Sequence, residues 1–231
     1  AIFSLAYSLS GGLKAVAMTD VVQVVLLIFG GLAVSFIALN TISESTGVVN
    51  GMKIVFDQMP EKFDMILSCD NPSYKNLPGI WILFGLGVWI GHFFYWGFNQ
   101  YITQRALGAK SIKEAQKGVM FAAYLKLLMP IVIVLPGICA AILFPVLEKS
   151  DQAYPTMMSL LPNGLLGLTF AALIAAIVSS LASMSNSIST IFTMDIYRYF
   201  KGEEHNQASL IKVGRYTAVS YTHLRAHETI R

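Results

Sequence analysis

Long uncharged stretches alternate with polar segments along this chain. Residues 21–39, 77–104 and 160–194 contain no Asp, Glu, Lys or Arg. A helix of about 20 residues crosses the hydrocarbon core of a bilayer, which is roughly 30 Å thick, so each stretch is long enough to span it. The pattern predicts helices at about 13–40, 78–104, 116–144 and 163–198, with a helix end at 1–10 and the start of another helix at 212.

Both ends of the chain differ from this pattern. The pair Gly11–Gly12 is predicted to end the helix whose last residues are 1–10, because paired glycines interrupt helices. Residues 220–231 replace the apolar pattern of 213–219 with a polar run, through which no spanning helix is expected to continue. We interpret that run as a non-native tail and expect a single transmembrane domain over 1–219. The chain begins on apolar residues without a starting Met and is interpreted as a segment of a longer protein.

The segments between the predicted helices alternate in the sign of their charge. One set of segments is basic, and its basic residues are Lys14, Arg105, Lys110, Lys113, Lys117, Arg198, Lys201, Lys212 and Arg215. The segments between them are acidic, and their acidic residues are Glu44, Asp57, Glu61, Asp64, Asp70, Glu148 and Asp151. Because basic segments stay on the cytoplasmic side, the sequence predicts 11–14, 103–117 and 199–211 inside the cell, and 41–77 and 145–162 outside.

Composition supports the same class of protein. Only 13% of the residues are charged, with a mean hydropathy of +0.61, whereas an ordinary soluble domain has about 25% charged residues. We therefore predict an all-α polytopic membrane protein, surrounded by a lipid bilayer, and not a water-soluble enzyme. The net charge of +3 is dispersed, which does not suggest a nucleic-acid partner. Cys69 and Cys139 are predicted to be free thiols without zinc or redox spacing.

Polar groups within predicted spans are costly and are therefore candidate functional residues. Lys126 lies about ten residues inside its predicted helix, roughly 15 Å along it at 1.5 Å per residue. One hypothesis is a lysine whose long side chain reaches the cytoplasmic interface. The other is a hydrogen-bond donor that lines a water-filled cavity.

The last predicted span has a polar face. Ser183, Asn186, Ser187 and Thr190 follow Ser179 at spacings that place all five on one side of a helix. Small residues let membrane helices pack closely, which is one interpretation of this face. The other is a set of neutral oxygens for a hard cation such as Na⁺, because transporters bind coupling ions at sites of this kind.

The span at 78–104 combines glycines with aromatic residues. Its glycines are Gly85, Gly87, Gly91 and Gly97. Such interruption is typical of a discontinuous helix at a binding site, and aromatic faces with a few polar groups suit a sugar. An interfacial aromatic belt is the alternative. His92 is also explained as an ordinary buried histidine, and Asp20 as a first-turn acid favoured by the helix dipole or as a relay for a cation.

Several motifs together resemble the sodium/solute symporter family, most closely its bacterial sodium/galactose branch, which is related to the animal sodium/glucose transporters. The resemblance extends over about residues 5–219. The motifs are Leu77-Pro-Gly-Ile, Tyr95-Trp-Gly-Phe-Asn-Gln-Tyr, Gln104-Arg, Ala109-Lys-Ser, Glu114-Ala-Gln-Lys-Gly, Lys126-Leu, Ala176-Ile-Val-Ser-Ser-Leu-Ala-Ser-Met and Ile191-Phe-Thr-Met-Asp-Ile-Tyr.

The resemblance implies part of the LeuT-type inverted-repeat fold of five plus five helices. This chain matches core helices five to eight, with parts of four and nine. By match, Ala176, Ser179 and Ser180 are expected to be the eighth-helix half of the sodium site, and Asp20 an acid on the sodium route.

For the solute, the resemblance implies three residues. Tyr95 matches the aromatic gate that stacks on the sugar, and Lys126 matches a lysine that hydrogen-bonds sugar hydroxyls. His92 stands where the sodium/galactose branch has an asparagine sugar ligand. Histidine can also donate and accept hydrogen bonds, but its larger ring is expected to change which hydroxyl is recognised.

The expected function is therefore sodium-coupled symport of a galactose- or glucose-like neutral sugar across a bacterial inner membrane, with Na⁺ as the co-transported ion and no other cofactor. A related alternative is another solute of the same family: myo-inositol, proline or pantothenate. An intramembrane hydrolase with Ser179 or Ser180 as nucleophile and Lys126 as base is the alternative from another class, although no glycine-elbow motif surrounds either serine.

Overall fold

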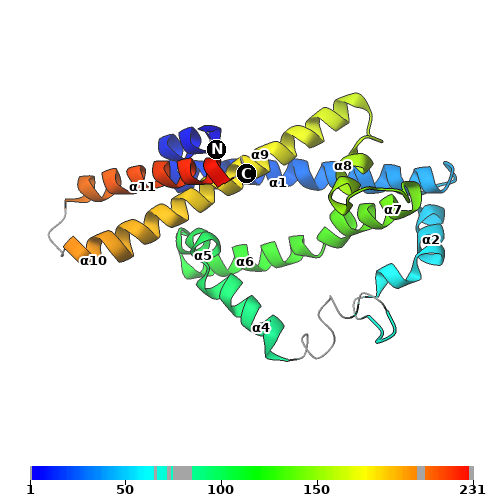
Figure 1. The fold of residues 1–231 in the computed structure, drawn as a ribbon, viewed down its shortest axis with the longest axis horizontal. Coiled ribbons are helices and arrows are strands. Elements are labelled where there is room, and N and C mark those ends of the chain that lie inside the picture. Colours follow the sequence, from blue (N-terminus) through cyan, green and yellow to red (C-terminus); the bar gives the residue numbers. More distant parts are fainter. Residues whose placement is uncertain (1, 65–66, 72–73, 75–84, 202–205, 229–231) are drawn as a thin grey trace. The chain divides into compact units, whose positions relative to one another are not determined.

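Helices joined by turns and short loops make up the part of the chain described by the computed structural model, which comprises residues 2–64, 67–71, 74, 85–201 and 206–228. None of these residues lies in a strand (Figure 1). The α-helices are α1 (Ile2–Ile42), α2 (Val48–Gln58), α4 (Leu86–Phe93), α5 (Gln100–Leu107), α6 (Ile112–Lys126), α7 (Leu135–Leu143), α8 (Ala153–Met158), α9 (Asn163–Ile191), α10 (Arg198–Lys201) and α11 (Gln207–Glu228). The shorter turns are the 3-10 helices η1 (Pro60–Phe63) and η5 (Ser150–Gln152), and the π-helices η3 (Phe94–Phe98), η4 (Pro130–Val134) and η6 (Phe192–Tyr197).

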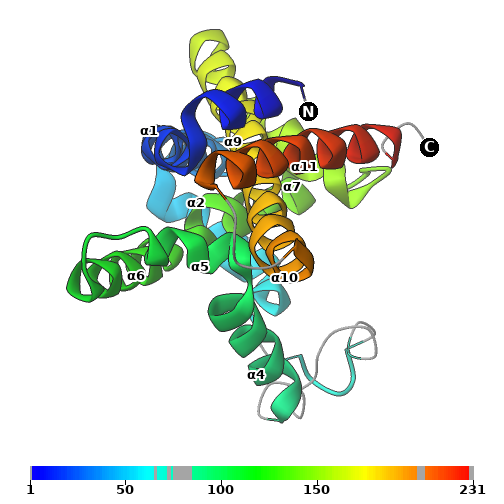
Figure 2. The ribbon, with the colours of Figure 1, turned by 90° about the vertical axis from the view of Figure 1, so that its left-hand side faces the viewer.

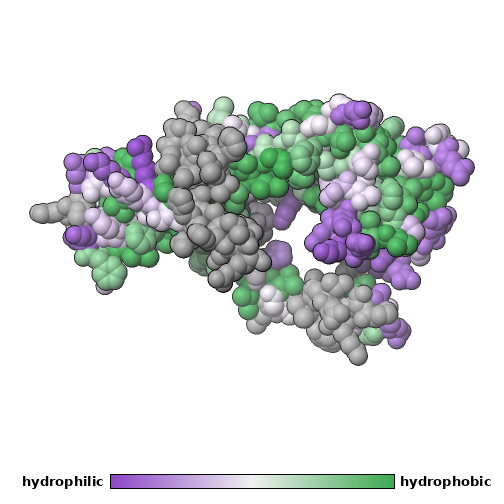
Figure 3. Space-filling view, turned by 45° about the horizontal axis from the view of Figure 1, so that its top comes forward, coloured by the Kyte–Doolittle hydropathy of each residue, from purple (hydrophilic) through white to green (hydrophobic). Residues whose placement is uncertain are grey.

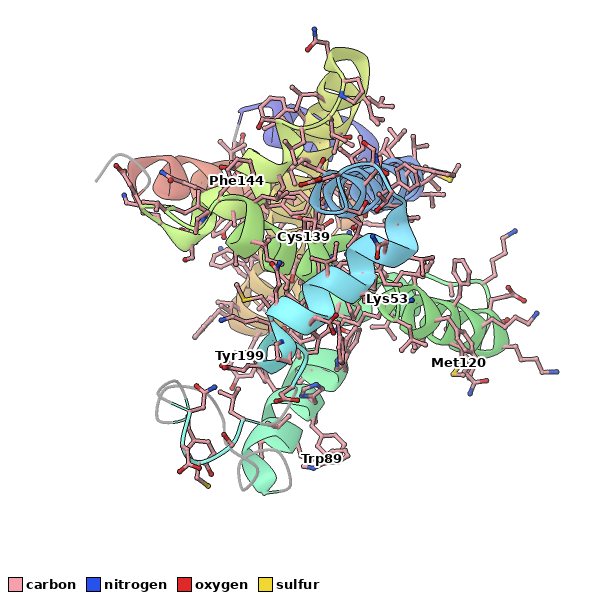
Figure 4. The ribbon with its side chains drawn as sticks, turned by 90° about the vertical axis from the view of Figure 1, so that its right-hand side faces the viewer. Lys53, Trp89, Met120, Cys139, Phe144 and Tyr199 are labelled. Atoms are coloured by element: carbon pink, nitrogen blue, oxygen red, sulfur yellow. The ribbon has the colours of Figure 1, made fainter. Side chains whose placement is uncertain are left out.

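Three helical stretches among the described residues are long and apolar enough to cross a membrane. They are Val16–Ile42, Ile112–Leu143 and Asn163–Lys201. Hydrophobic residues occupy broad areas of the face drawn in Figure 3. Figure 4 shows the side chains of Trp89 and Met120 extending away from their helices, and more than half of each is exposed. Apolar side chains exposed in this way are suited to contact with lipid or with further helices.

The two chain ends are more helical than the sequence predicts. α1 continues through Gly11–Gly12, so the expected break there is wrong. A backbone in apolar surroundings has no water to replace its helical hydrogen bonds, and glycine therefore interrupts membrane helices less than soluble ones. α11 continues past Ser220 to Glu228. That residues 220–231 are a non-native tail stays a prediction, as does the single domain over 1–219.

The predicted span at 78–104 is discontinuous in its described part. α4 ends at Phe93, the π-helix η3 follows, and α5 begins only after Asn99. The Asn99 side chain accepts a hydrogen bond from the backbone N–H of Tyr101 at 3.1 Å, which stabilises a new helix start. The glycine pattern predicts this break, whereas residues 78–84 and the motif that starts at Leu77 lie outside the described residues.

The chain divides into two compact units. The first unit comprises Ala1–Val25, Phe98–Gln116 and Ala171–Arg231, and the second comprises Leu26–Gly97 and Lys117–Phe170. In the first unit α11 packs on the end of α9 and on η6 (Figure 1). Ser189 Oγ of α9 donates to the carbonyl of Gly214 at 2.6 Å, an approach that the missing side chain of Gly214 allows.

In the second unit a serine completes the hydrogen bonding of the bend between α6 and α7. The N–H of Leu135 bonds the carbonyl of Pro130, five residues back. Pro136 has no N–H to continue this register to the carbonyl of Ile131. Ser35 Oγ of α1 donates to that carbonyl at 2.5 Å instead. The side chain of Cys139 is buried nearby within α7 (Figure 4).

The segment 41–77 contains a helix that the hydrophobic pattern does not predict. α2 mixes apolar and polar residues over only eleven positions, and Gly51 and Val55, one turn apart, are its buried residues. A Cβ atom added to Gly51 would overlap the backbone of Leu39 in α1. Glycine at position 51 is therefore required for the close approach of α2 to α1.

Gly51→Ala is expected to destabilise the protein by about 1–3 kcal/mol, because the overlapping atoms are backbone and cannot rotate away. The measurement is the melting temperature of the purified full-length protein in detergent. Gly137→Ala is the matched control, since nothing lies within 4 Å of the added Cβ in α7, and its melting temperature should equal or exceed that of the wild type. Equal melting temperatures for the two variants would contradict the close approach.

Candidate functional site

A polar cluster of the first unit joins α1, α5 and α9, the helices labelled in Figure 2. Nη2 of Arg105 lies 2.5 Å from Oδ2 of Asp20 and donates to Oγ of Ser183 at 2.8 Å. Ser179 Oγ donates to Oδ1, the other carboxylate oxygen of Asp20. The two charged side chains are partly buried, with 33% of Arg105 and 24% of Asp20 exposed. One carboxylate therefore connects a cation on α5 with a hydroxyl on α9.

Two neighbours on α5 hold this arrangement. Gln104 is buried, and its Nε2 donates to the carbonyl of Ser183 at 3.2 Å. The guanidinium carbon of Arg105 lies 5.2 Å from the ring centroid of Tyr101, within the range of a cation–π contact. The short helix α5 is thus bonded to α9 at two points. Gln104 donates to a backbone carbonyl of α9, and Arg105 donates to the hydroxyl of Ser183.

The expected sodium ligands occupy one face of α9. Ala176, Ser179 and Ser180 are three and four residues apart, which places them on adjoining positions of a helix. Ser179 is buried, while Ala176 and Ser180 are partly exposed. A backbone carbonyl and two hydroxyls in this arrangement offer neutral oxygens, the ligand type that hard cations prefer.

Asp20 does not lie in the first turn of a helix. α1 begins at Ile2, so Asp20 is well inside it and beyond the effect of the helix dipole, which fades within the first turn. The first-turn explanation of this acid is therefore wrong. The structure instead gives Asp20 two specific partners, Ser179 and Arg105.

A hollow of about 420 Å³ adjoins the cluster within the first unit. It lies between α5 and α9, and the polar side chains of both helices face it. Its lining consists of Gln100, Gln104, Leu107, Gly108, Asn186, Ser189 and Thr190. Amide and hydroxyl groups of this kind can solvate a cation or hydrogen-bond a polar solute.

The expected solute residues belong to the second unit. The ring of Tyr95 meets Trp96 edge-on with centroids 5.2 Å apart, and Lys126 Nζ lies 4.6 Å from the ring centroid of Trp96. Lys126 therefore points at the broken segment η3. His92 is exposed, and its Nδ1 is 2.8 Å from the carbonyl of Val88, so the explanation of His92 as a buried histidine is wrong.

Comparison with known proteins identifies the family. The model of the sodium:solute symporter family matches residues 1–225. The chain belongs to the sodium:solute symporter family. Its relatives include the sodium/glucose cotransporter of Vibrio parahaemolyticus, 47% identical over 95% of this chain and 43% of the relative. The human sodium/myo-inositol cotransporter 2 is 35% identical over 90% of this chain and 34% of the relative.

The fold of this symporter-family chain resembles that of a Na⁺-coupled sialic acid symporter solved in a substrate-bound, outward-open state. The TM-score is 0.76 with 22% identity, over 94% of this chain and 46% of the symporter. The chain thus has part of the LeuT-type inverted-repeat fold, and it spans less than half the length of the relatives it matches. It is part of a multi-pass membrane protein, and its family comprises transporters and not hydrolases.

Two members of the polar cluster are not among the sodium residues expected from the sequence. In the sequence, Arg105 is evident as a basic residue of a cytoplasmic segment and as part of the Gln104-Arg motif, and Ser183 as part of the polar face and of the motif that starts at Ala176, with no sodium role expected for either. The topology contains a usable signal, because it predicts both Asp20 and Arg105 near cytoplasmic ends of spans. An acid and a base at one depth in neighbouring spans are expected to pair.

Proposed function

We propose that this chain forms the central part of a sodium-coupled symporter for a small neutral sugar. The observation that carries the proposal is the hydrogen bond from Ser179 to Asp20. It connects the face with the expected sodium ligands to an acid on another helix. A cation leaving those ligands therefore has a carboxylate as its next partner.

In the proposed mechanism, Na⁺ binds Ala176, Ser179 and Ser180 together with groups from the rest of the protein. The ion stabilises a conformation with higher affinity for the solute, and this differential binding couples the two movements. One positive charge moving inward supplies about 2.3 kcal/mol per 100 mV of membrane potential. On release the ion passes from Ser179 to Asp20 and then to the hollow beside Gln104, which is expected from the charge pattern to face the cytoplasm.

The solute site of the proposal is built on η3 and α6. Tyr95 stacks on the apolar face of the sugar and closes the cytoplasmic side as a gate. Lys126 donates to sugar hydroxyls, and its contact with Trp96 supports this role over that of a lysine that reaches the interface. His92, at the end of α4, supplies a further hydrogen-bonding group and affects which sugar is accepted.

The preferred solute class is a neutral polyol. The sodium/glucose relative supports a hexose, and the sodium/myo-inositol relatives make myo-inositol the second candidate. Both solutes offer many hydroxyls and no charge, which suits aromatic rings with a few donors. The proposed location is the inner membrane of a bacterium, which the Vibrio relative supports.

Ser180→Ala is expected to raise the Na⁺ concentration for half-maximal uptake about tenfold in the full-length protein, because a hydroxyl ligand to a charged group contributes about 1.5–3 kcal/mol. The measurement is the Na⁺ dependence of labelled galactose uptake into proteoliposomes. Ser159→Ala, in the segment after α8, is the control and should keep the wild-type dependence. An unchanged Na⁺ dependence in Ser180→Ala would remove this residue from the sodium site.

A further inference from the structure

Arg105 forms an ion pair with Asp20, the acid proposed to receive Na⁺. Its Nη2 contacts both Asp20 on α1 and Ser183 on α9. The same carboxylate accepts a hydrogen bond from Ser179 through its other oxygen. Asp20 therefore lies between a cation that belongs to the protein and the face that holds the expected sodium ligands.

A guanidinium and a sodium ion cannot both be neutralised by one carboxylate. Arginine stays charged in proteins, so it cannot remove the conflict by losing its proton. When Na⁺ reaches Asp20, repulsion between the two cations favours movement of the Arg105 side chain away from the carboxylate. Gln104, its neighbour on α5, lines the polar hollow, which offers amide and hydroxyl oxygens for a displaced guanidinium.

We propose that Arg105 is a built-in competitor of Na⁺ for Asp20. The guanidinium pairs with Asp20 when the ion is absent, withdraws while the ion is there, and returns as the ion leaves toward the cytoplasm. Arg105 thus lowers the affinity of the transporter for Na⁺ and favours ion release. The inference rests on the proposed sodium route and adds to it a residue that opposes sodium binding.

The test is the Na⁺ dependence of thermal stability in the purified full-length protein, measured at constant ionic strength with K⁺ as the replacement ion. Binding of Na⁺ to the folded state raises the melting temperature, and this readout requires no knowledge of the solute. Arg105→Gln is expected to lower the Na⁺ concentration that gives half of the full rise in melting temperature by about fivefold. This factor corresponds to the free energy of one partly exposed ion pair. A residue with a purely structural role would not increase Na⁺ affinity when it is removed.

Three further variants make the test specific. Arg198→Gln removes an exposed cation of α10 and should leave the Na⁺ dependence unchanged, which controls for general electrostatics. Ser183→Ala keeps all charges but removes one contact that holds Arg105. It should lower the half-maximal Na⁺ concentration for thermal stabilisation about twofold. In the Asp20→Asn background, adding Arg105→Gln should not lower the half-maximal Na⁺ concentration relative to Asp20→Asn alone, because the carboxylate for which the two cations compete is gone.

The proposal is overturned if folded Arg105→Gln has an unchanged or higher half-maximal Na⁺ concentration for thermal stabilisation. If Arg105→Gln does not fold, the same result in Ser183→Ala overturns it. A fivefold decrease that persists in the Asp20→Asn background would also overturn it. Wild-type protein without any Na⁺-dependent stabilisation contradicts the sodium site itself and the competitor with it. The expected decrease in Arg105→Gln supports the competitor whichever solute the transporter carries.

Discussion

Asp20→Asn is expected to raise the Na⁺ concentration for half-maximal solute uptake by about 100-fold. Two unit charges 4 Å apart attract by about 4 kcal/mol at an effective dielectric constant of 20, and about 2.7 kcal/mol corresponds to 100-fold. Asparagine has nearly the same shape and can still accept the hydrogen bond from Ser179, so the helices should stay in place. The measurement is labelled-solute uptake into proteoliposomes over a range of Na⁺ concentrations.

The control is Asp151→Asn, which removes an exposed acid from the segment before α8 and should keep the wild-type Na⁺ dependence. Asp20→Asn and Arg105→Gln have opposite expected signs, since one removes the attraction for Na⁺ and the other removes its competitor. If Asp20→Asn takes up solute with the wild-type Na⁺ dependence, the ion does not depend on Asp20 and the proposed route is wrong.

Lys126→Met is expected to weaken the apparent affinity for the sugar by about 30-fold. Methionine keeps an unbranched side chain of similar length that can pack on Trp96, but it has no donor for the sugar hydroxyls. A hydrogen bond to a charged group contributes about 1.5–3 kcal/mol, which brackets a 30-fold change. The concentration dependence of labelled galactose uptake at saturating Na⁺ measures the effect.

Na⁺-dependent thermal stabilisation of Lys126→Met should match the wild type, because Lys126 is not part of the proposed sodium site. Lys113→Met is the matched control, as it changes an exposed lysine near the start of the same helix α6. If both lysine variants show the wild-type affinity for galactose, glucose and myo-inositol, Lys126 has only an interfacial role.

Local signals in the sequence account for the helices and for the break in the span at 78–104. The length of the apolar stretches predicts α1, the pair α6 and α7, and α9, because a helix needs about 20 apolar residues to cross a bilayer. Glycines among aromatic residues indicate the discontinuity around η3. The amphipathic helix α2 is not evident, because it is only eleven residues long and lies in a segment whose charges and prolines indicate a loop.

The pairing of Asp20 with Arg105 depends on helix packing and not on local pattern. Eighty-five positions separate the two residues, and no periodicity connects residues on different helices. The serine face of α9 is evident from its spacing, yet the spacing alone does not tell whether Ser183 serves helix packing or a polar site. The position of Trp96 between Tyr95 and Lys126 likewise follows from how α6 approaches η3.

Reconstitution of the full-length protein tests whether solute uptake is coupled to sodium. Uptake of labelled galactose into proteoliposomes is compared under an inward Na⁺ gradient and an equal K⁺ gradient, with unlabelled glucose and myo-inositol as competitors. Sodium-coupled symport predicts accumulation of galactose above the external concentration with the Na⁺ gradient but not with the K⁺ gradient, and competition by at least one other neutral polyol. Equal uptake of labelled galactose, glucose and myo-inositol in Na⁺ and K⁺, by protein shown to be folded, would contradict it.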